Sequence, residues 1–233
     1  MKNTTSSAIK NTHPAAMKNT ISSAGAKTTP ALWAPLFLAL FIILTISSLS
    51  SCKSTKAETS FTPEELLIIN DTLAPLLKVY TIEDESDSTL LRQICTPLTP
   101  ADISSPAYRT LAHRMVKTVS DSTVDGVGIA GPQVGLLRQV VAVQRFDKEG
   151  FPFEVYPNIS IIARSQETED GREGCLSVPD KSGLVTRAQW VVISYTSPQT
   201  LQQVQDTVKG FTARIFQHET DHLKGILYTD YLK

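Results

Sequence analysis

The stretch Gln217-His218-Glu219-Thr220-Asp221-His222, near the carboxyl end of the chain, decides the fold prediction. It lies within residues 211–223, whose apolar spacing predicts a helix that ends at Lys224-Gly225. The two histidines stand at positions i and i+4, so they project from one helix face and can bind one metal ion. Glu219 can reach a metal-bound water without being a ligand itself. A His-Glu-x-x-His pattern on a helix is typical of metallohydrolases.

The alternative interpretation of this helix is a polar face with two solvated histidines. The apolar neighbours disfavour it, because Phe211 and Ile215 lie on the same stripe as the two histidines. The stripe therefore faces the core, where an unpaired polar ring costs free energy. We expect both histidines to be metal ligands.

Two histidines do not complete a metal site, and several residues could provide the third ligand. The candidates are His113, Cys95, Cys175 and a carboxylate downstream of the helix. Cys175 lies in the segment Glu173-Gly174-Cys175-Leu176-Ser177-Val178-Pro179, a loop bounded by Gly and Pro that can bring a thiolate close to a metal. A lone Cys is more often a small buried hydrophobic residue, which is our interpretation of Cys95.

A third segment is rich in glycine: Gly126-Val127-Gly128-Ile129-Ala130-Gly131-Pro132-Gln133-Val134-Gly135. Its glycine spacing resembles that of the phosphate-binding loops of dinucleotide sites. However, Pro132 lies inside it and no clear helix follows, so the pattern does not favour a dinucleotide site. Repeated glycines allow a backbone to approach a ligand closely. Gln133 offers an amide donor that can stabilise an oxyanion.

The remaining patterns predict an α+β domain. Apolar spacing behind a Ser cap and an early Pro predicts a helix over residues 105–120. Residues rich in Val, Ile, Phe and Tyr predict strands over 139–145, 153–162, 184–187, 191–195 and 202–208. Thr62 marks a helix start, and residues 83–88 are interpreted as an acidic loop. This order favours a sheet rich in antiparallel pairs.

Taken in order, the three segments resemble the signature motifs of peptide deformylase, G-x-G-x-A-A-x-Q, E-G-C-L-S and Q-H-E-x-D-H. The resemblance covers roughly residues 75–232. It implies an α+β fold with a mixed, antiparallel-rich sheet around a central metal-binding helix. It also implies hydrolysis of the N-terminal formyl group of formyl-methionyl peptides, with release of formate.

The resemblance implies roles for individual residues. One divalent ion, commonly Fe²⁺ with Zn²⁺ or Ni²⁺ as alternatives, would be held by Cys175, His218 and His222. Glu219 would be the general base, and Gln133 with the backbone N–H of Leu176 would bind the oxyanion. The substrate peptide would pair as an added strand with the backbone of Gly126, Val127, Gly128 and Ile129. Its first side chain would lie among Val127, Phe211 and Ile215.

Two positions depart from the family pattern. Gly131 stands where the motif has its second Ala, which should spare the chemistry. Ser182 stands near a position where many relatives carry a basic residue that contacts the substrate backbone. The alternatives to a deformylase are a related exported amidase or peptidase and a module that binds formyl peptides without turnover; the intact Glu219 disfavours the second.

The beginning of the chain predicts export. Residues 1–57 contain no Asp or Glu, and residues 31–46 form an apolar run shorter than the roughly 20 residues that span a bilayer. A basic leader followed by a short apolar core and small residues is typical of a signal peptide; a single transmembrane anchor is the alternative. Leu49-Ser50-Ser51-Cys52 resembles the lipobox of bacterial lipoproteins, which implies lipidation of Cys52.

The expected organisation is a signal peptide with lipobox over residues 1–51, a tether over 52–60 and a catalytic domain over 61–233. The protein would then be a lipoprotein anchored in a bacterial membrane, on the periplasmic side or the cell surface. Its composition, 41% hydrophobic and 19% charged with a net charge of −1, excludes a wholly disordered chain and gives no basic surface for nucleic acid. We expect a monomer.

Overall fold

A computed structural model describes residues 59–232 of the protein. The predicted signal peptide over residues 1–51, the lipidation site Cys52 and most of the 52–60 tether lie outside the described residues. Within the described part of the chain, no helix combines the length and the apolar character that crossing a membrane requires.

Over residues 59–232, five α-helices and eight strands follow one another in the order that the sequence predicts for its longest elements. The elements are α1 (Pro63–Asn70), α2 (Glu85–Leu91), α3 (Pro100–Ser104), α4 (Pro106–Val119), β1 (Gly128–Ala130), η1 (Gly131–Val134), β2 (Val140–Gln144), β3 (Phe153–Pro157), β4 (Ser160–Arg164), β5 (Thr168–Cys175), β6 (Val178–Ala188), β7 (Trp190–Thr196), β8 (Gln203–Lys209), α5 (Gly210–His222) and η2 (Tyr228–Tyr231). The mixture of helices and sheets confirms the α+β class.

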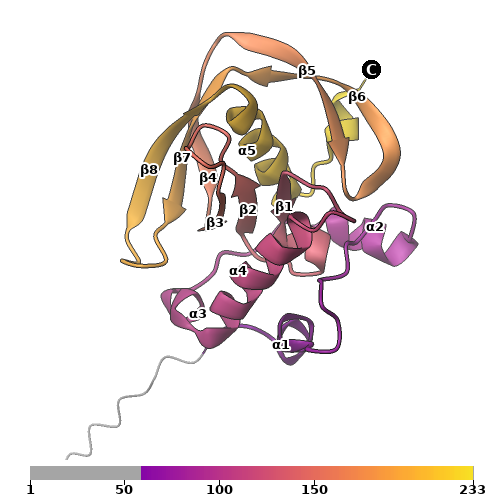
Figure 1. Ribbon diagram of the computed structural model, residues 1–233, viewed down its shortest axis with the longest axis vertical. Helices are drawn as coiled ribbons and strands as arrows, with labels where there is room; N and C mark the ends of the chain where they lie inside the picture. Colours follow the sequence, from indigo (N-terminus) through magenta and orange to yellow (C-terminus); the bar gives the residue numbers. More distant parts are fainter. Residues whose placement is uncertain (1–58, 233) are drawn as a thin grey trace, which may run out of the picture. The chain divides into compact units, whose positions relative to one another are not determined.

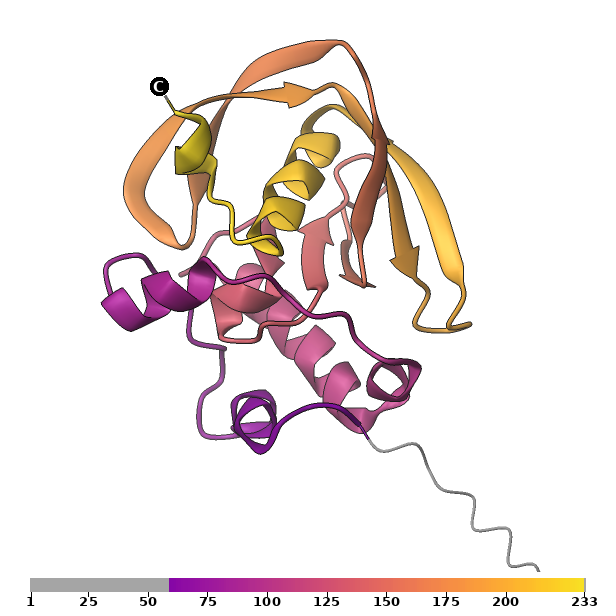
Figure 2. The ribbon, with the colours of Figure 1, turned by 180° about the vertical axis from the view of Figure 1, so that it is seen from behind.

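Three small antiparallel sheets surround α5 (Figure 1). Their strand orders are β1-β2-β3, β4-β7-β8 and β5-β6. The long β5–β6 hairpin arches over α5, and the carboxyl-terminal segment with η2 lies beside this hairpin when the molecule is seen from behind (Figure 2). The helix that carries His218 and His222 is therefore enclosed by strands, as the family resemblance implies.

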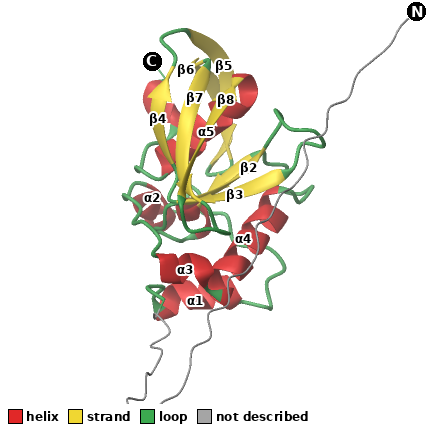
Figure 3. Cartoon of the chain, turned by 90° about the vertical axis from the view of Figure 1, so that its left-hand side faces the viewer, coloured by secondary structure: helices red, strands yellow, loops and turns green. Residues whose placement is uncertain are grey.

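The helices α1, α3 and α4 gather on the opposite side of the β1-β2-β3 sheet (Figure 3). Helix α4 begins where the Ser105 side chain accepts a hydrogen bond from the Tyr108 N–H, and Pro106 occupies the first turn. Its apolar face, with Leu111, Met115 and Val119, packs in one core cluster. A second core cluster holds the apolar side of α5 against the sheets.

The structure corrects several predicted elements. Residues 83–88 are not a loop, because Asp84 caps α2 by accepting from the N–H groups of Ser86 and Asp87. The predicted strand over residues 153–162 is two strands, β3 and β4. Asn158 separates them with a left-handed φ of 55°, and its amide hydrogen-bonds both backbone groups of Leu98.

Two strands were not predicted. Strand β5 reads as a run of charged and small residues, and β1 is a three-residue strand inside the glycine-rich segment. Both lack the β-branched composition on which the strand prediction depends. Phe211 also departs from the expected core-facing stripe, since it is 53% exposed at the start of α5.

Candidate active site

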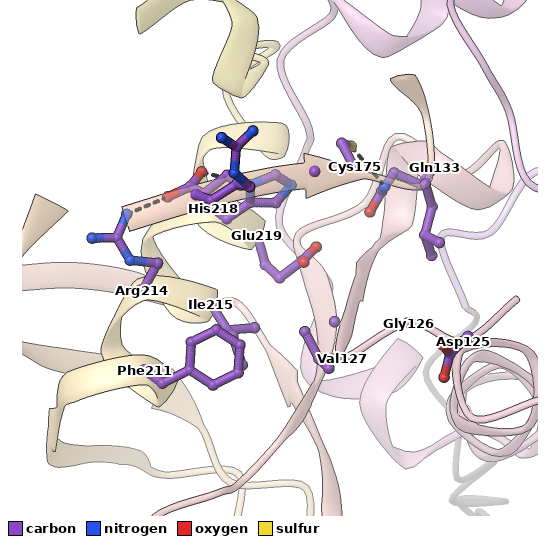
Figure 4. Close-up of a pocket in the computed structure, with 15 residues that line it drawn as sticks. Asp125, Gly126, Val127, Gln133, Cys175, Phe211, Arg214, Ile215, His218 and Glu219 are labelled. Atoms are coloured by element: carbon purple, nitrogen blue, oxygen red, sulfur yellow. Dashed lines mark hydrogen bonds and ion pairs between the residues drawn. The ribbon is translucent and has the colours of Figure 1, made fainter. Parts of the chain in front are cut away.

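The three predicted metal ligands come together between α5 and the β5–β6 hairpin. The side-chain donor atoms of Cys175, His218 and His222 all lie within 4.8 Å of one another. Cys175 Sγ is 3.3 Å from His222 Nε2. The two histidines share a helix face because they are one turn apart, and the end of β5 brings the thiol onto that face. In Figure 4 the His218 side chain, from α5, and the Cys175 side chain, from β5, both lie at the upper side of the pocket.

A buried carboxylate orients His218. The Nδ1 of His218 lies 3.0 Å from Glu173 Oε2, which leaves Nε2 as the nitrogen that can bind a metal. Glu173 is held in turn by Arg187, whose Nε and Nη2 donate at 2.9 and 3.0 Å, and by Arg214 at 3.0 Å. Burial opposes ionisation of Glu173, but the hydrogen bonds from His218 and Arg187 outweigh it and lower the pKa to about 2.

Glu219 is the second carboxylate of the site. Unlike Glu173, it has few polar partners around it. The side chain is 4% exposed, and Oε2 has no hydrogen-bond partner within residues 59–232. Burial raises the pKa of this carboxyl to about 7, with His218 partly offsetting the rise. A carboxyl whose pKa lies near neutrality can both accept and release a proton, which is the property of a general acid–base group.

Glycine at position 128 makes room for Glu219. A Cβ added to Gly128 would overlap the carboxylate of Glu219, so any larger residue would displace that carboxylate. A Cβ at Gly126 would lie 2.8 Å from Val119 Cγ2 and 3.0 Å from Leu176 Cδ1. The glycine-rich segment therefore brings its backbone against the site, as its sequence predicts.

Gln133 is fixed with its amide nitrogen toward the thiol. Oε1 accepts from the Ala130 N–H at 2.8 Å, and Nε2 lies 3.2 Å from Ser177 Oγ and 3.6 Å from Cys175 Sγ. Because the side chain is 1% exposed and its oxygen is already engaged, the nitrogen is the end presented to the site. The fold thus places the Gln133 amide nitrogen beside Cys175, one of the predicted metal ligands.

A pocket of about 350 Å³ opens onto these groups. Besides Gln133, Cys175, Leu176, His218 and Glu219, it is lined by five of the six residues that the resemblance assigns to substrate binding: Gly126, Val127, Gly128, Phe211 and Ile215. Figure 4 shows Val127 facing Phe211 and Ile215, with Glu219 above them. The pocket therefore combines an apolar wall with an acid–base group and metal donors, which is the usual composition of an active site.

Some sequence candidates lie elsewhere. Ile129 is fully buried in a core cluster and does not line the pocket. His113 is exposed on α4, and Cys95 is buried among apolar residues, where burial raises the pKa of its thiol to about 12. Of the candidate third ligands named from the sequence, Cys175 is thus the one that the fold places beside the histidines.

Sequence reasoning missed the residues that support the ligands. Glu173 and Arg214 line the pocket, and Arg187 lies behind them. Glu173 stands two residues before Cys175, which is the signal that could have drawn attention to it. Arg214 precedes His218 by four residues and Arg187 follows Cys175 by twelve, but only the fold shows that both pair with Glu173.

The donor set fits a resident metal ion. One thiolate and two imidazoles are ligands for Zn²⁺, Fe²⁺ or Ni²⁺, and burial lowers the pKa of His222 well below its usual value, so this ring is neutral and able to bind. The unpartnered Oε2 of Glu219 beside the donors leaves a carboxylate oxygen for a metal-bound water. A helix bearing two metal-binding histidines and a buried glutamate, enclosed by antiparallel sheets, defines a metallohydrolase.

Comparison with known proteins identifies the family. The family model for polypeptide deformylase matches residues 76–233, and the chain therefore belongs to the polypeptide deformylase family, whose members remove N-formyl groups from nascent peptides in a metal-dependent reaction. A peptide deformylase of Roseiflexus sp. (strain RS-1) is 32% identical over 170 residues, which are 68% of this chain and 89% of that protein.

Solved structures agree with this assignment. A class I type b peptide deformylase from Acinetobacter baumannii with bound Met-Ala-Ser matches with a TM-score of 0.60 and 35% identity, over 67% of this chain and 98% of that chain. The peptide deformylase from Thermotoga maritima matches with a TM-score of 0.59 and 28% identity, over 68% of this chain and 98% of that chain. The predicted family, fold and enzyme class are thereby confirmed.

Proposed function

We propose that Cys175, His218 and His222 hold one divalent ion, with which the chain hydrolyses the formyl group of N-formylmethionyl peptides. The observation that carries this proposal is the convergence of these three donors, within 4.8 Å of one another, on a pocket that also contains the buried Glu219. When bound, a divalent ion lowers the pKa of a water and polarises a carbonyl oxygen. The family favours Fe²⁺, and the donor set also accepts Zn²⁺ or Ni²⁺.

Glu219 is the residue that transfers the proton in this proposal. Its Oε2 is free of hydrogen-bond partners in the described chain, and its pKa of about 7 lets it take a proton from the attacking water. The same carboxyl then returns the proton to the leaving amine nitrogen, so formate and a free amino terminus are produced. Gln133 Nε2, together with the backbone N–H of Leu176, donates to the oxygen that becomes negative during the attack.

Substrate binding follows from the edge of the β1-β2-β3 sheet. Strand β1 pairs only with β2 in the described chain, so its second edge can accept an extended peptide. Backbone groups of the segment from Gly126 to Ile129 would pair with the peptide. Its methionine side chain would then contact Val127, Ile215 and the exposed ring of Phe211.

The experiment is release of formate from formyl-Met-Ala-Ser by the purified protein, loaded without oxygen with Fe²⁺, Ni²⁺ or Zn²⁺. Acetyl-Met-Ala-Ser serves as the matched substrate, because a general amidase would accept both. We expect formate from the formyl peptide and no acetate from the acetyl peptide. Full metal occupancy without formate release would contradict the proposal.

We also propose that the protein is an exported lipoprotein attached through Cys52, and that it acts as a monomer on formyl peptides outside the cytoplasm. The support is the apolar run over residues 31–46 followed by the Leu49-Ser50-Ser51-Cys52 sequence. Mass spectrometry of the amino terminus in the membrane fraction would show a lipid-modified cysteine. Cys52→Ser is expected to abolish that modification, while sedimentation of the detergent-free domain tests the monomer.

A further inference from the structure

The rim of the pocket carries an arginine that the proposed chemistry does not use. Arg172, on β5, lines the same pocket as Glu219 and is exposed. Its Nη1 donates to Ser182 Oγ at 2.9 Å across the hairpin. Within residues 59–232 no carboxylate forms a salt bridge with it, so most of its N–H donors are open to a ligand.

The other arginine of the pocket is not available in this way. Arg214 is 6% exposed, and its donors are engaged inside the fold. Nη1 donates to Glu173 at 3.0 Å and to the Val185 carbonyl at 2.8 Å, and Nη2 donates to the Glu169 carbonyl at 2.8 Å. Figure 4 shows Arg214 joined by a dashed line to this network. Arg172 is therefore the cationic group that the pocket presents to a substrate.

The position of Arg172 along β5 sets which part of a peptide it can reach. Successive strand residues point to opposite faces, so Glu173 turns inward to His218 and Arg172 turns outward. Arg172 precedes Cys175 by three residues, which is about 10 Å along an extended strand. An extended peptide with its formyl carbon at the metal ligands has its second and third residues at roughly the same distance, about 6 to 10 Å.

We propose that Arg172 is a specificity-determining residue whose guanidinium binds a carboxylate on the second or third residue of the substrate, so that the enzyme prefers acidic formyl peptides. An arginine fork and a carboxylate form paired hydrogen bonds. Ser182 holds one nitrogen of the fork in place at the rim. The assignment deepens the proposed deformylase function and rests on it.

The test is a set of six amidated peptides, in which the terminal carboxylate is absent. Formyl-Met-Ala-Ala-amide is the neutral reference, formyl-Met-Ser-Ala-amide is a polar reference, and Asp or Lys is placed at the second or the third residue. We expect kcat/KM for Asp to exceed that for Lys by about three- to tenfold at one of these positions at low salt. The preference is expected to shrink in about 0.5 M salt, because exposed charges are screened.

Two variants identify the source of the preference. Arg172→Gln is expected to bring the Asp-to-Lys ratio close to one, and Arg172→Lys to keep part of it. Lys181→Gln is the matched control, since it removes one positive charge from the same hairpin outside the pocket, and it should leave the ratio unchanged. A role limited to the hydrogen bond with Ser182 would change thermal stability but not the ratio.

The outcomes separate this inference from the proposed function. Formate release from the neutral peptide without any charge preference would overturn the role of Arg172 alone. A preference that survives in Arg172→Gln would overturn it as well. A metal-loaded enzyme that releases no formate from any of the six peptides would overturn the proposed function and this assignment together.

Discussion

Arg187 and Arg138 are both buried, and each forms paired hydrogen bonds with a glutamate, but the two ion pairs lie in different surroundings. Arg187 binds Glu173 beneath the pocket, and the Glu173 carboxylate also forms hydrogen bonds with His218 and Arg214. Arg138 binds Glu65 of α1 at 2.6 Å and reaches Ser60 at the beginning of the described chain. The first pair orients His218, a proposed metal ligand, and the second holds the amino-terminal segment on the domain.

The two clusters differ in whether they leave polar atoms without a hydrogen-bond partner. In the Arg138 cluster every strong donor and acceptor is satisfied internally, since Ser60 also binds Asp102 at 2.6 and 2.7 Å. In the Arg187 cluster the neighbouring His218 keeps its Nε2 free for a ligand, and Glu219 keeps an oxygen without a partner in the described chain. Similar ionic chemistry thus stabilises the fold in one region and prepares a reactive site in the other.

The largest effect should come from Glu219→Gln. The change removes the proton acceptor while keeping the size of the side chain, so kcat should fall about 10²- to 10⁴-fold. Metal content measured by elemental analysis should stay at the level of the unmodified protein, because Glu219 is not expected to be a ligand. The counterpart in the other cluster, Glu65→Gln, should leave kcat unchanged. A comparable loss of kcat in that variant would show that the two clusters do not differ in the way described.

Arg138→Met should mainly affect stability. Removing the guanidinium leaves Glu65 without its cation, and breaking a buried pair in this way costs about 3 kcal/mol. Urea unfolding followed by circular dichroism measures the loss. The folded, metal-loaded fraction should keep its kcat, and a reduced kcat in that fraction would show that the Arg138 cluster also supports catalysis.

Glu173→Gln should weaken metal binding by about 10- to 100-fold. The amide cannot accept from His218 with the strength of a carboxylate, so the ligand ring is oriented less firmly. Competition with a chromogenic chelator gives the affinity. Unchanged metal affinity in this variant would mean that Glu173 stabilises the hairpin rather than the metal ligand.

The last effect concerns the pH dependence of the stability of the metal-free protein. The pKa of Glu219 is raised to about 7, so its contribution to stability is fully present below the unfolded value of 4.5 and is lost as the pH rises through 7. Glu219→Gln should therefore stabilise the metal-free chain by about 2 to 3 kcal/mol at pH 8 and by less than about 1 kcal/mol at pH 5. Glu173 behaves oppositely, since its pKa is lowered to about 2 and its contribution is lost only in acid.

Unfolding curves in urea at the two pH values measure this difference. A gain of equal size at pH 5 and pH 8 would show that burial of Glu219 does not govern its ionisation.

The sequence predicted the parts of the site that depend on local spacing. The pair His218 and His222 follows from helix periodicity, and the predicted helix over 211–223 differs from α5 by one residue at each end. Cys175 needed more than spacing, because Cys95 and His113 were also candidates until the fold placed them elsewhere. The family resemblance, rather than periodicity, singled out Cys175.

The parts that were not predicted depend on pairing between distant segments. Strand β5 is polar because most of its residues are exposed, so the usual strand composition is absent. Contacts between distant segments leave no periodic signal in a single sequence. Helix α2 was missed for a different reason: its cap is local, from Asp84 to the N–H groups of Ser86 and Asp87, but the helix has only seven residues and its acidic start was interpreted as a loop.

The metal ligands come from two elements that are separate in the chain, Cys175 at the end of β5 and the two histidines of α5. A bound ion would therefore act as a clasp between the hairpin and the helix. Loss of the ion would remove this link, so the hairpin of the metal-free protein should open locally more often than that of the metal-loaded protein. The same clasp makes resistance to unfolding rise with the concentration of free metal, which links the lifetime of the folded enzyme to the metal supply of its surroundings.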